Sequence, residues 1–223
     1  MHLHSLSSPY AGPIVSVKSA PGVIIATGNV GQFLDLSDIG TFLSRDGGVH
    51  WYKIGNGSHI YEIGNQGGLI VMAEDQKPSK YIYITWNQGV TWIKQKISEK
   101  RIYITNIVQE KNNTGLKFLV YGISKQHGSY GFIVPLNFEG LLPRQCVHWE
   151  DRSKSDYEIW IPTNQNNQCL MGKKMSYLRK KPSSECFNTD GFSLINKPEI
   201  CECTLDDYEC NTGFVKDKYG DCT

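Results

Sequence analysis

The residues with the widest chemical scope in this chain are its cysteines, which can form disulfides, bind a metal or act as nucleophiles. All seven lie after residue 145: Cys146, Cys169, Cys186, Cys201, Cys203, Cys210 and Cys222. Structural zinc sites favour two Cys-x2-Cys pairs, and the only close pair here is Cys201-x-Cys203. No histidine stands in a motif that would activate a thiolate. The density is typical of small disulfide-stabilised domains in an oxidising compartment, so we expect disulfides and no metal or other cofactor. The odd count leaves one cysteine unpaired.

A second set of polar residues recurs in the N-terminal part. The stretch Ser44–Trp51 (SRDGGVHW) aligns with Thr85–Trp92 (TWNQGVTW), 41 residues later, and both read [ST]-x-[DN]-x-G-x-x-W. This Asp-box motif also occurs in glycosidases such as sialidases. These need paired carboxylates, or a tyrosine nucleophile with an acidic partner, and an arginine cluster for an anionic sugar. Before residue 137 only Arg45 and Arg101 are arginines, and nothing links them to a carboxylate pair.

We therefore predict no catalytic residues and a structural role for the motif. Its members are Ser44, Asp46, Gly48, Trp51, Thr85, Asn87, Gly89 and Trp92. The Asp or Asn side chain is expected to bond backbone amides within the turn, where glycine tolerates a positive φ. The tryptophan is expected to pack across the hairpin.

Weaker patterns have simpler explanations. His2 and His4 would share one face of a strand, but two ligands make a poor metal site. The basic stretch formed by Lys173, Lys174, Arg179, Lys180 and Lys181 is expected to be a solvated face. Asn56 and Asn112 open N-x-[ST] sequons and are candidates for glycosylation.

The elements that position these residues are short β-strands. Between residues 12 and 136, β-branched and aromatic runs alternate with glycine-rich turns, and no helical period persists. The 41-residue repeat, with about four strands per unit, is the spacing of propeller blades. We predict an all-β fold whose residues 1–136 form the last two or so blades of a propeller. Two blades cannot close a ring, so we expect the chain to be a segment of a longer protein.

A different region follows. Residues 137–145 are expected to be a connector and residues 146–223 an incomplete cysteine-rich module, in which Met171–Lys181 is compatible with a helix. The net charge of +1 gives no electrostatic reason for a nucleic-acid partner. No apolar run approaches the roughly 18 residues that span a bilayer.

Four motifs resemble those of the sortilin family of vacuolar-sorting receptors. The first is SRDGGVHW followed by HIYEIGNQGGLIVMAE, and the second is WNQGVTW. The third is C-x-x-x-D-Y-x-x-W, stretched here to CVHWEDRSKSDYEIW and running into CLMGKKMSYLRKKPSSEC. The fourth, C-x-C-[ST]-x-x-D-[FY]-x-C, is present as CECTLDDYEC and is the most specific. The resemblance covers about residues 12–222.

The resemblance implies the terminal blades of a ten-bladed ring followed by a disulfide-rich module. It implies the pairs Cys146–Cys186, Cys169–Cys201 and Cys210–Cys222, with Cys203 unpaired here. It also implies a type I transmembrane receptor without catalytic activity, which carries protein or peptide cargo between Golgi, endosome and vacuole or lysosome. The chain would then lie on the lumenal or extracellular side, in the Golgi–endosome system or at the cell surface. Membrane contact would come only through a helix outside this sequence. Cargo in this family binds inside the propeller, largely on earlier blades, so no cargo residues are assigned.

Two other functions remain open. One is an Asp-box glycosidase of the sialidase type, and the other is a secreted structural module without a sorting role.

Overall fold

The computed structural model describes residues 2–3, 14–31, 38–110, 113–125, 130–148, 153–163, 168–188, 198–204 and 207–223. The described residues form strands and turns, with one short 3-10 turn, η2 (Asn65–Gly67), and no α-helix. None of their elements is a helix of the length and apolarity that crossing a membrane requires. The all-β prediction is confirmed.

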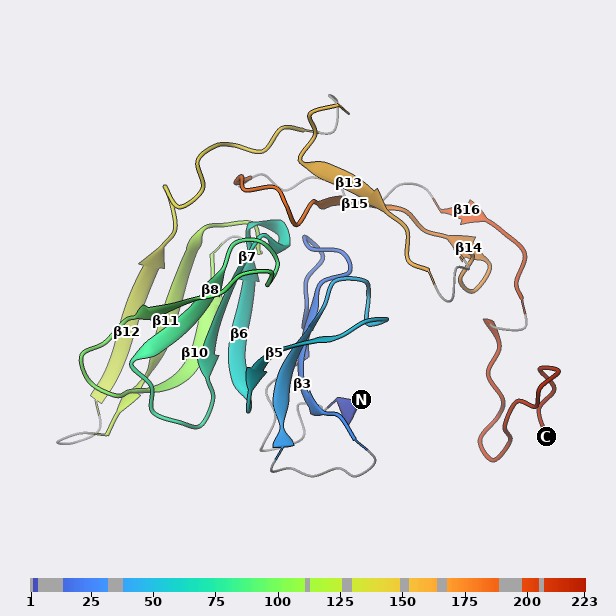
Figure 1. Ribbon diagram of the computed structural model, residues 1–223, viewed down its shortest axis with the longest axis horizontal. Coiled ribbons are helices and arrows are strands. Elements are labelled where there is room, and N and C mark those ends of the chain that lie inside the picture. Colours follow the sequence, from blue (N-terminus) through green and yellow to red (C-terminus); the bar gives the residue numbers. More distant parts are fainter. Residues whose placement is uncertain are drawn as a thin grey trace. The chain divides into compact units, whose positions relative to one another are not determined.

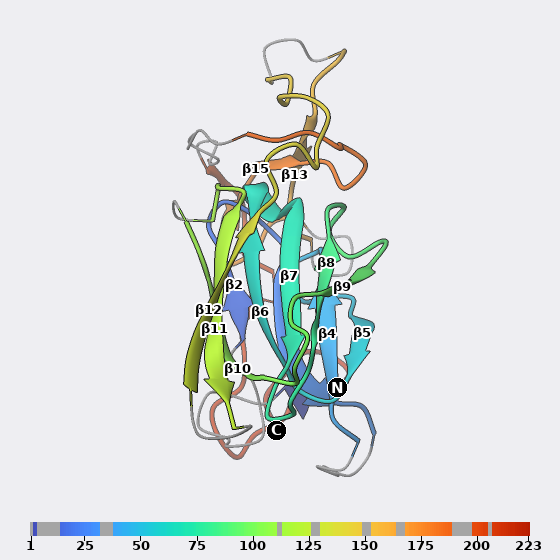
Figure 2. The same cartoon turned by 90° about the vertical axis from the view of Figure 1, so that its left-hand side faces the viewer.

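Three antiparallel sheets follow one another along the chain (Figure 1). The first contains β1 (His2–Leu3), β2 (Val15–Ser16), β3 (Ile24–Asn29), β4 (Gly40–Ser44) and β5 (Tyr52–Asn56), and both β1 and β2 pair with β3. The second contains β6 (His59–Gly64), β7 (Leu69–Glu74), β8 (Tyr81–Thr85) and β9 (Ile93–Lys96). The third contains β10 (Tyr103–Gln109), β11 (Lys117–Ser124) and β12 (Tyr130–Asn137). Figure 2 shows their strands running lengthwise beside one another, as propeller blades do.

The middle sheet is covered on both faces, because successive side chains of a strand point to opposite sides. In β7, Ile70 and Met72 pack with Ile25 and Leu43 of the first sheet. The alternate residues of the strand, Leu69, Val71 and Ala73, point to the opposite face. They belong to a second core cluster with residues of the third sheet such as Ile107, Phe118 and Val120. A strand buried on both faces reads as a continuous apolar run, as LIVMA does here.

The number of sheets differs from the expected two or so blades. The two Asp-box motifs mark the β4–β5 and β8–β9 connections, whereas among the described residues the third sheet has no strand after β12 and so no such connection. Counting motifs therefore misses the third sheet, although its three strands match the runs seen in the sequence.

The helix suggested for Met171–Lys181 is wrong. This stretch contains β14 (Lys173–Lys174) and β15 (Tyr177–Lys180). β15 pairs with β13 (Tyr157–Trp160), and β14 pairs with β16 (Glu199–Ile200). Pairing with distant strands overrides a helix propensity that is only a weak preference.

The chain divides into two compact units. One consists of Met1–Glu158 with Arg179–Phe192, and the other of Ile159–Leu178 with Ser193–Thr223. The boundaries expected from the sequence, at residues 137–145, stay a prediction.

Candidate functional site: where the blades hold the cysteine-rich segment

The first Asp-box turn, Ser44–Trp51, closes on itself through hydrogen bonds. The Gly48 amide donates to Ser44 Oγ (2.8 Å), and the His50 amide donates to Asp46 Oδ1 (2.9 Å). Trp51 Nε1 donates to the Gly48 carbonyl (2.8 Å), which lays the indole over its own turn. Gly48 has a φ of +98°, a conformation that glycine adopts without strain.

The second turn, Thr85–Trp92, repeats this pattern bond for bond. The Gly89 amide donates to Thr85 Oγ1 (2.9 Å) and the Thr91 amide to Asn87 Oδ1 (2.9 Å). Trp92 Nε1 donates to the Gly89 carbonyl (3.2 Å). The polar side chains of both motifs are thus engaged in holding their own turns, which is a structural role.

A third turn, between β6 and β7, receives a distant part of the chain. Asn65 and Gln66 both have a positive φ (47° and 56°) and are buried. Asn65 Nδ2 donates to the Cys186 carbonyl (3.0 Å), and Asn65 Oδ1 accepts from the Asn188 amide (3.1 Å). Gln66 Oε1 accepts from the Tyr157 hydroxyl (2.9 Å), which in turn accepts from Asn188 Nδ2 (2.8 Å).

Residues 179–188, called the anchor segment below, lie over this turn and contact both Asp-box turns. Arg179 Nη1 donates to the Arg45 carbonyl (2.6 Å), and Trp86 Nε1 donates to Glu185 (3.1 Å). Arg45 and Trp86 occupy the same position of the motif, directly after its Ser or Thr. Gln88 Nε2 adds a bond to the Lys180 carbonyl (3.0 Å). Each Asp-box turn therefore has a second role, as a support for the anchor segment.

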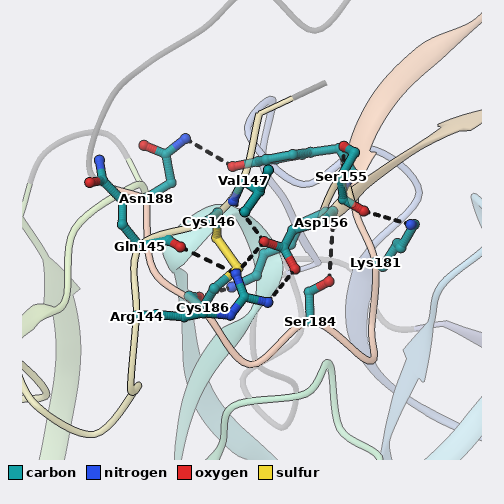
Figure 3. Close-up of polar contacts among 12 residues, drawn as sticks. Arg144, Gln145, Cys146, Val147, Ser155, Asp156, Lys181, Ser184, Cys186 and Asn188 are labelled. Atoms are coloured by element: carbon teal, nitrogen blue, oxygen red, sulfur yellow. Dashed lines mark hydrogen bonds and ion pairs between the residues drawn. A yellow bond between two sulfur atoms is a disulfide. The ribbon is translucent and has the colours of Figure 1, made fainter. Parts of the chain in front are cut away.

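The anchor segment is fixed on its other side by Asp156, whose carboxylate is buried (Figure 3). Arg144 binds Asp156 through two nitrogens (2.5 and 2.7 Å), and the Val147 amide donates to the same carboxylate (2.7 Å). These bonds hold the pKa of Asp156 well below its usual range, the Arg144 guanidinium having the largest effect. The Asp156 carbonyl accepts from the Lys181 amide (2.9 Å) and Ser184 Oγ (3.2 Å). Asp156 thus joins two stretches of chain: its carboxylate holds Arg144 and Val147, and its carbonyl holds the anchor segment.

Lys180 corrects the expectation of a solvated basic face. Its side chain is 1% exposed, and its Nζ donates to the Cys186 carbonyl. Burial lowers the pKa of Lys180 to about 7. Arg179 is also engaged, with Nε 2.8 Å from Glu158 Oε1, and Lys181 Nζ lies 2.6 Å from the Ser155 carbonyl. The charges in the sequence could not reveal this, because they do not show which of the basic side chains are buried.

The cysteines form three disulfides: Cys146–Cys186, Cys169–Cys201 and Cys210–Cys222. Cys203 is free and exposed. Cys146, Cys186 and Asp156 are close enough together to hold a metal ion. The two sulfur atoms are bonded to each other, and Asp156 is bound by Arg144, so these groups are engaged as a structural site.

The remaining sequence candidates do not converge on one place. Asn56 is exposed at the end of β5, whereas Asn112 and His4 lie outside the described residues. His2 belongs to β1. Arg45 Nε donates to the Gln88 carbonyl (2.9 Å), and Arg101 faces the Pro78 carbonyl (3.4 Å). The two blade arginines are thus bound to backbone at separate places, which disfavours a sialidase-type anion site.

Comparison with known proteins gives matches over the whole chain. The family model for "Sortilin, neurotensin receptor 3" matches residues 1–107, and the model for its C-terminal part matches residues 109–223. The chain is 38% identical over 232 residues to a protein of Uncinocarpus reesii named vacuolar protein sorting/targeting protein 10, and equally to the protein of that name in Coccidioides posadasii. A Fusarium vanettenii protein of the same name is 34% identical over 216 residues, which cover 93% of the chain. The chain spans only 14–16% of the length of these relatives.

Proposed function

Because the chain belongs to the sortilin family of vacuolar protein sorting receptors, we propose that it is part of a type I transmembrane receptor that binds protein or peptide cargo in the lumen. The receptor carries this cargo between Golgi, endosome and vacuole or lysosome, and it works by binding without catalysis. Nucleic acid is not among its partners.

The observation that carries this proposal is the unbroken succession of two family matches, from the blade region into the cysteine-rich region. The disulfides agree with a lumenal location, because such bonds persist in oxidising compartments. We assign to the described residues a supporting role. The blade turns and the anchor segment keep the cysteine-rich region attached to the cargo-binding propeller.

A chimeric receptor tests the sorting function. In a fungal strain without its own receptor, this chain replaces the corresponding stretch of the Uncinocarpus reesii relative, and secretion of a vacuolar hydrolase is measured. We expect the chimera to keep the hydrolase inside the cell as the unaltered relative does. The sorting proposal fails if the hydrolase is secreted while the chimera reaches normal abundance and the normal compartment.

A matched variant tests the supporting role. Asp156→Ala in the chimera removes the carboxylate that fixes residue 156 to Arg144 and Val147, and it should reduce hydrolase retention together with receptor abundance. Glu199→Ala, at an exposed carboxylate 3.9 Å from Lys174, should leave both unchanged. Equal retention by both variants would contradict the supporting role without touching the sorting proposal.

A further inference from the structure

Lys180 is an amine enclosed by backbone. Among the described residues it is the only lysine whose side chain is buried. On the anchor side its Nζ donates to the Cys186 carbonyl. On the blade side it lies against the β6–β7 turn, where a Cβ atom at Gly68 would fall 2.7 Å from Nζ. A side chain at residue 68 would therefore crowd the amine where it now lies.

The charged groups that act on Lys180, Asp156 and Arg144, are bound to each other, and two further carboxylates of this region have other partners. Asp156 is held by Arg144 and the Val147 amide. Glu158 pairs with Arg179 on the neighbouring strand, and Glu185 accepts from Trp86.

Other groups add no negative charge. The Lys181 ammonium is bound to the Ser155 carbonyl, and the Tyr157 hydroxyl lies between Gln66 and Asn188. The blade residues beside Lys180, Asn65 and Gln88, are uncharged. An ammonium here would lose its hydration, and the attraction of the Asp156 carboxylate is opposed by the Arg144 guanidinium bound to it.

We propose that Lys180 makes the attachment of the anchor segment to the blades dependent on pH, so that the attachment loosens when the amine takes up a proton. Opening would break the contacts that the anchor segment makes to Asn65 and Gln88, while the Cys146–Cys186 disulfide keeps the segment tethered. This inference concerns the fold and does not depend on the sorting function.

The direction of the effect follows from the pKa of Lys180, about 7 when the segment is attached and near the ordinary 10.5 when it is detached and solvated. Between these values the detached state holds one more proton, so attachment weakens as the pH falls towards 7. Below 7 both states are protonated and the dependence levels off. From pH 8 to pH 6 the fraction detached should rise about tenfold.

Amide hydrogen exchange in the intact chain measures this opening. Peptides covering residues 179–188 should lose protection about tenfold between pH 8 and pH 6, after correction for the intrinsic pH dependence of exchange. Lys180→Met keeps most of the side chain's length without its charge, and its protection should not vary with pH. Lys173→Met, at an exposed lysine of the same stretch, should behave as the parent does. Parent protection that does not change with pH, or an equal change in Lys180→Met, would overturn the proposal.

A direct titration of the parent chain covers the case in which Lys180→Met does not fold. With carbon-13 at the lysine ε positions, nuclear magnetic resonance should show one amine titrating near pH 7. If no lysine signal titrates near pH 7, the proposal is wrong.

Discussion

At the residue scale, the Asp156 carboxylate is the charged group whose substitution is expected to cost the most stability. Its oxygens accept from Arg144 and Val147, and its side chain is 6% exposed. Asp156→Asn should lower the free energy of unfolding at pH 7 by about 2 kcal/mol, since hydrogen bonds to charged groups contribute about 1.5–3 kcal/mol. Denaturant titration measures this, with Glu199→Gln as the exposed control.

The pH dependence of this prediction has a definite sign. The pKa of Asp156 lies below its usual 3.8, so the stabilisation is complete above that value and is lost as the pH falls further. The gap between parent and Asp156→Asn should stay constant from about pH 5 to 8 and close below about pH 4. A gap that persists unchanged at the lowest pH of the folded state would contradict the role of the ionised carboxylate.

At the scale of elements, a histidine links the first two sheets. Thr41 Oγ1 on β4 lies 2.9 Å from the Gly57 carbonyl and 2.8 Å from His59 Nδ1, so the threonine hydroxyl and the histidine ring share a hydrogen-bonded contact. The Cε1 edge of the ring faces Gly55, where a Cβ would lie 2.6 Å from Cε1. Burial lowers the pKa of His59, because the protonated ring would be poorly hydrated there.

Acid should therefore weaken the contact between these sheets. Below the ordinary pKa of 6.5, the unfolded chain takes up a proton at this histidine before the folded chain does. Stability should fall with pH there by at most about 1.4 kcal/mol per unit for this group. His59→Asn keeps a donor near the Nδ1 position and should flatten the profile, whereas His148→Asn, at an exposed ring, should not. Calorimetric melting at several pH values makes the comparison.

Two glycines with nearly the same backbone conformation allow the cost of backbone strain to be measured apart from the cost of crowding in the core. Gly57 (φ +82°) and Gly89 (φ +79°) both favour glycine, but a Cβ at Gly57 meets nothing within 4 Å. At Gly89 it would lie 2.4 Å from Leu43 Cδ2, in the core between the first two sheets. Gly57→Ala should cost about 1 kcal/mol for its backbone. Gly89→Ala should cost about 2–4 kcal/mol, since crowding a packed core adds about 1–3 kcal/mol. If both variants lose the same free energy of unfolding in denaturant titrations, crowding against Leu43 adds no cost.

The sequence predicts the elements of the blades well because their signal is local. Strand length, alternation and the Asp-box turns are set by neighbouring residues, and the strands of all three sheets lie near the expected runs. The disulfide pairs needed the family pattern, since spacing alone leaves many pairings open. The fate of Lys180 was out of reach. Its burial depends on Gly68 and Gln88, about 100 residues away in the sequence, which no local pattern connects to it.

At the scale of the whole molecule, the outward face of the third sheet is apolar. Its exposed side chains include Val108, Leu119, Tyr121, Ile123 and Ile133. Along β11 they alternate with the buried residues of the second core, and β12 adds Ile133 opposite Tyr121. The corresponding faces of the first two sheets are covered by a neighbouring sheet, so this face has the composition of a contact surface.

We expect the chain alone to self-associate through this face. The double substitution Leu119→Thr and Ile133→Thr keeps strand propensity while removing apolar surface, and it should lower the average mass measured by light scattering. Val120→Thr is the matched control, because its side chain points into the core and is fully buried. It should destabilise the fold without improving solubility. A monodisperse monomer from the unaltered chain would contradict this prediction.

The contacts that three blade turns make with the anchor segment also determine where the chain can tolerate an inserted peptide. Both Asp-box turns and the β6–β7 turn hold that segment, so lengthening any of them by even one residue would move a support out of reach. Among the described residues, the β7–β8 connection makes no such hydrogen bond to the anchor segment. Gln76 within this connection is exposed and has a φ of +59°. An epitope tag or fluorophore-binding peptide inserted beside Gln76 should leave the fold intact. The β7–β8 connection could therefore vary in length during evolution, whereas the turns that hold the anchor segment should keep their length.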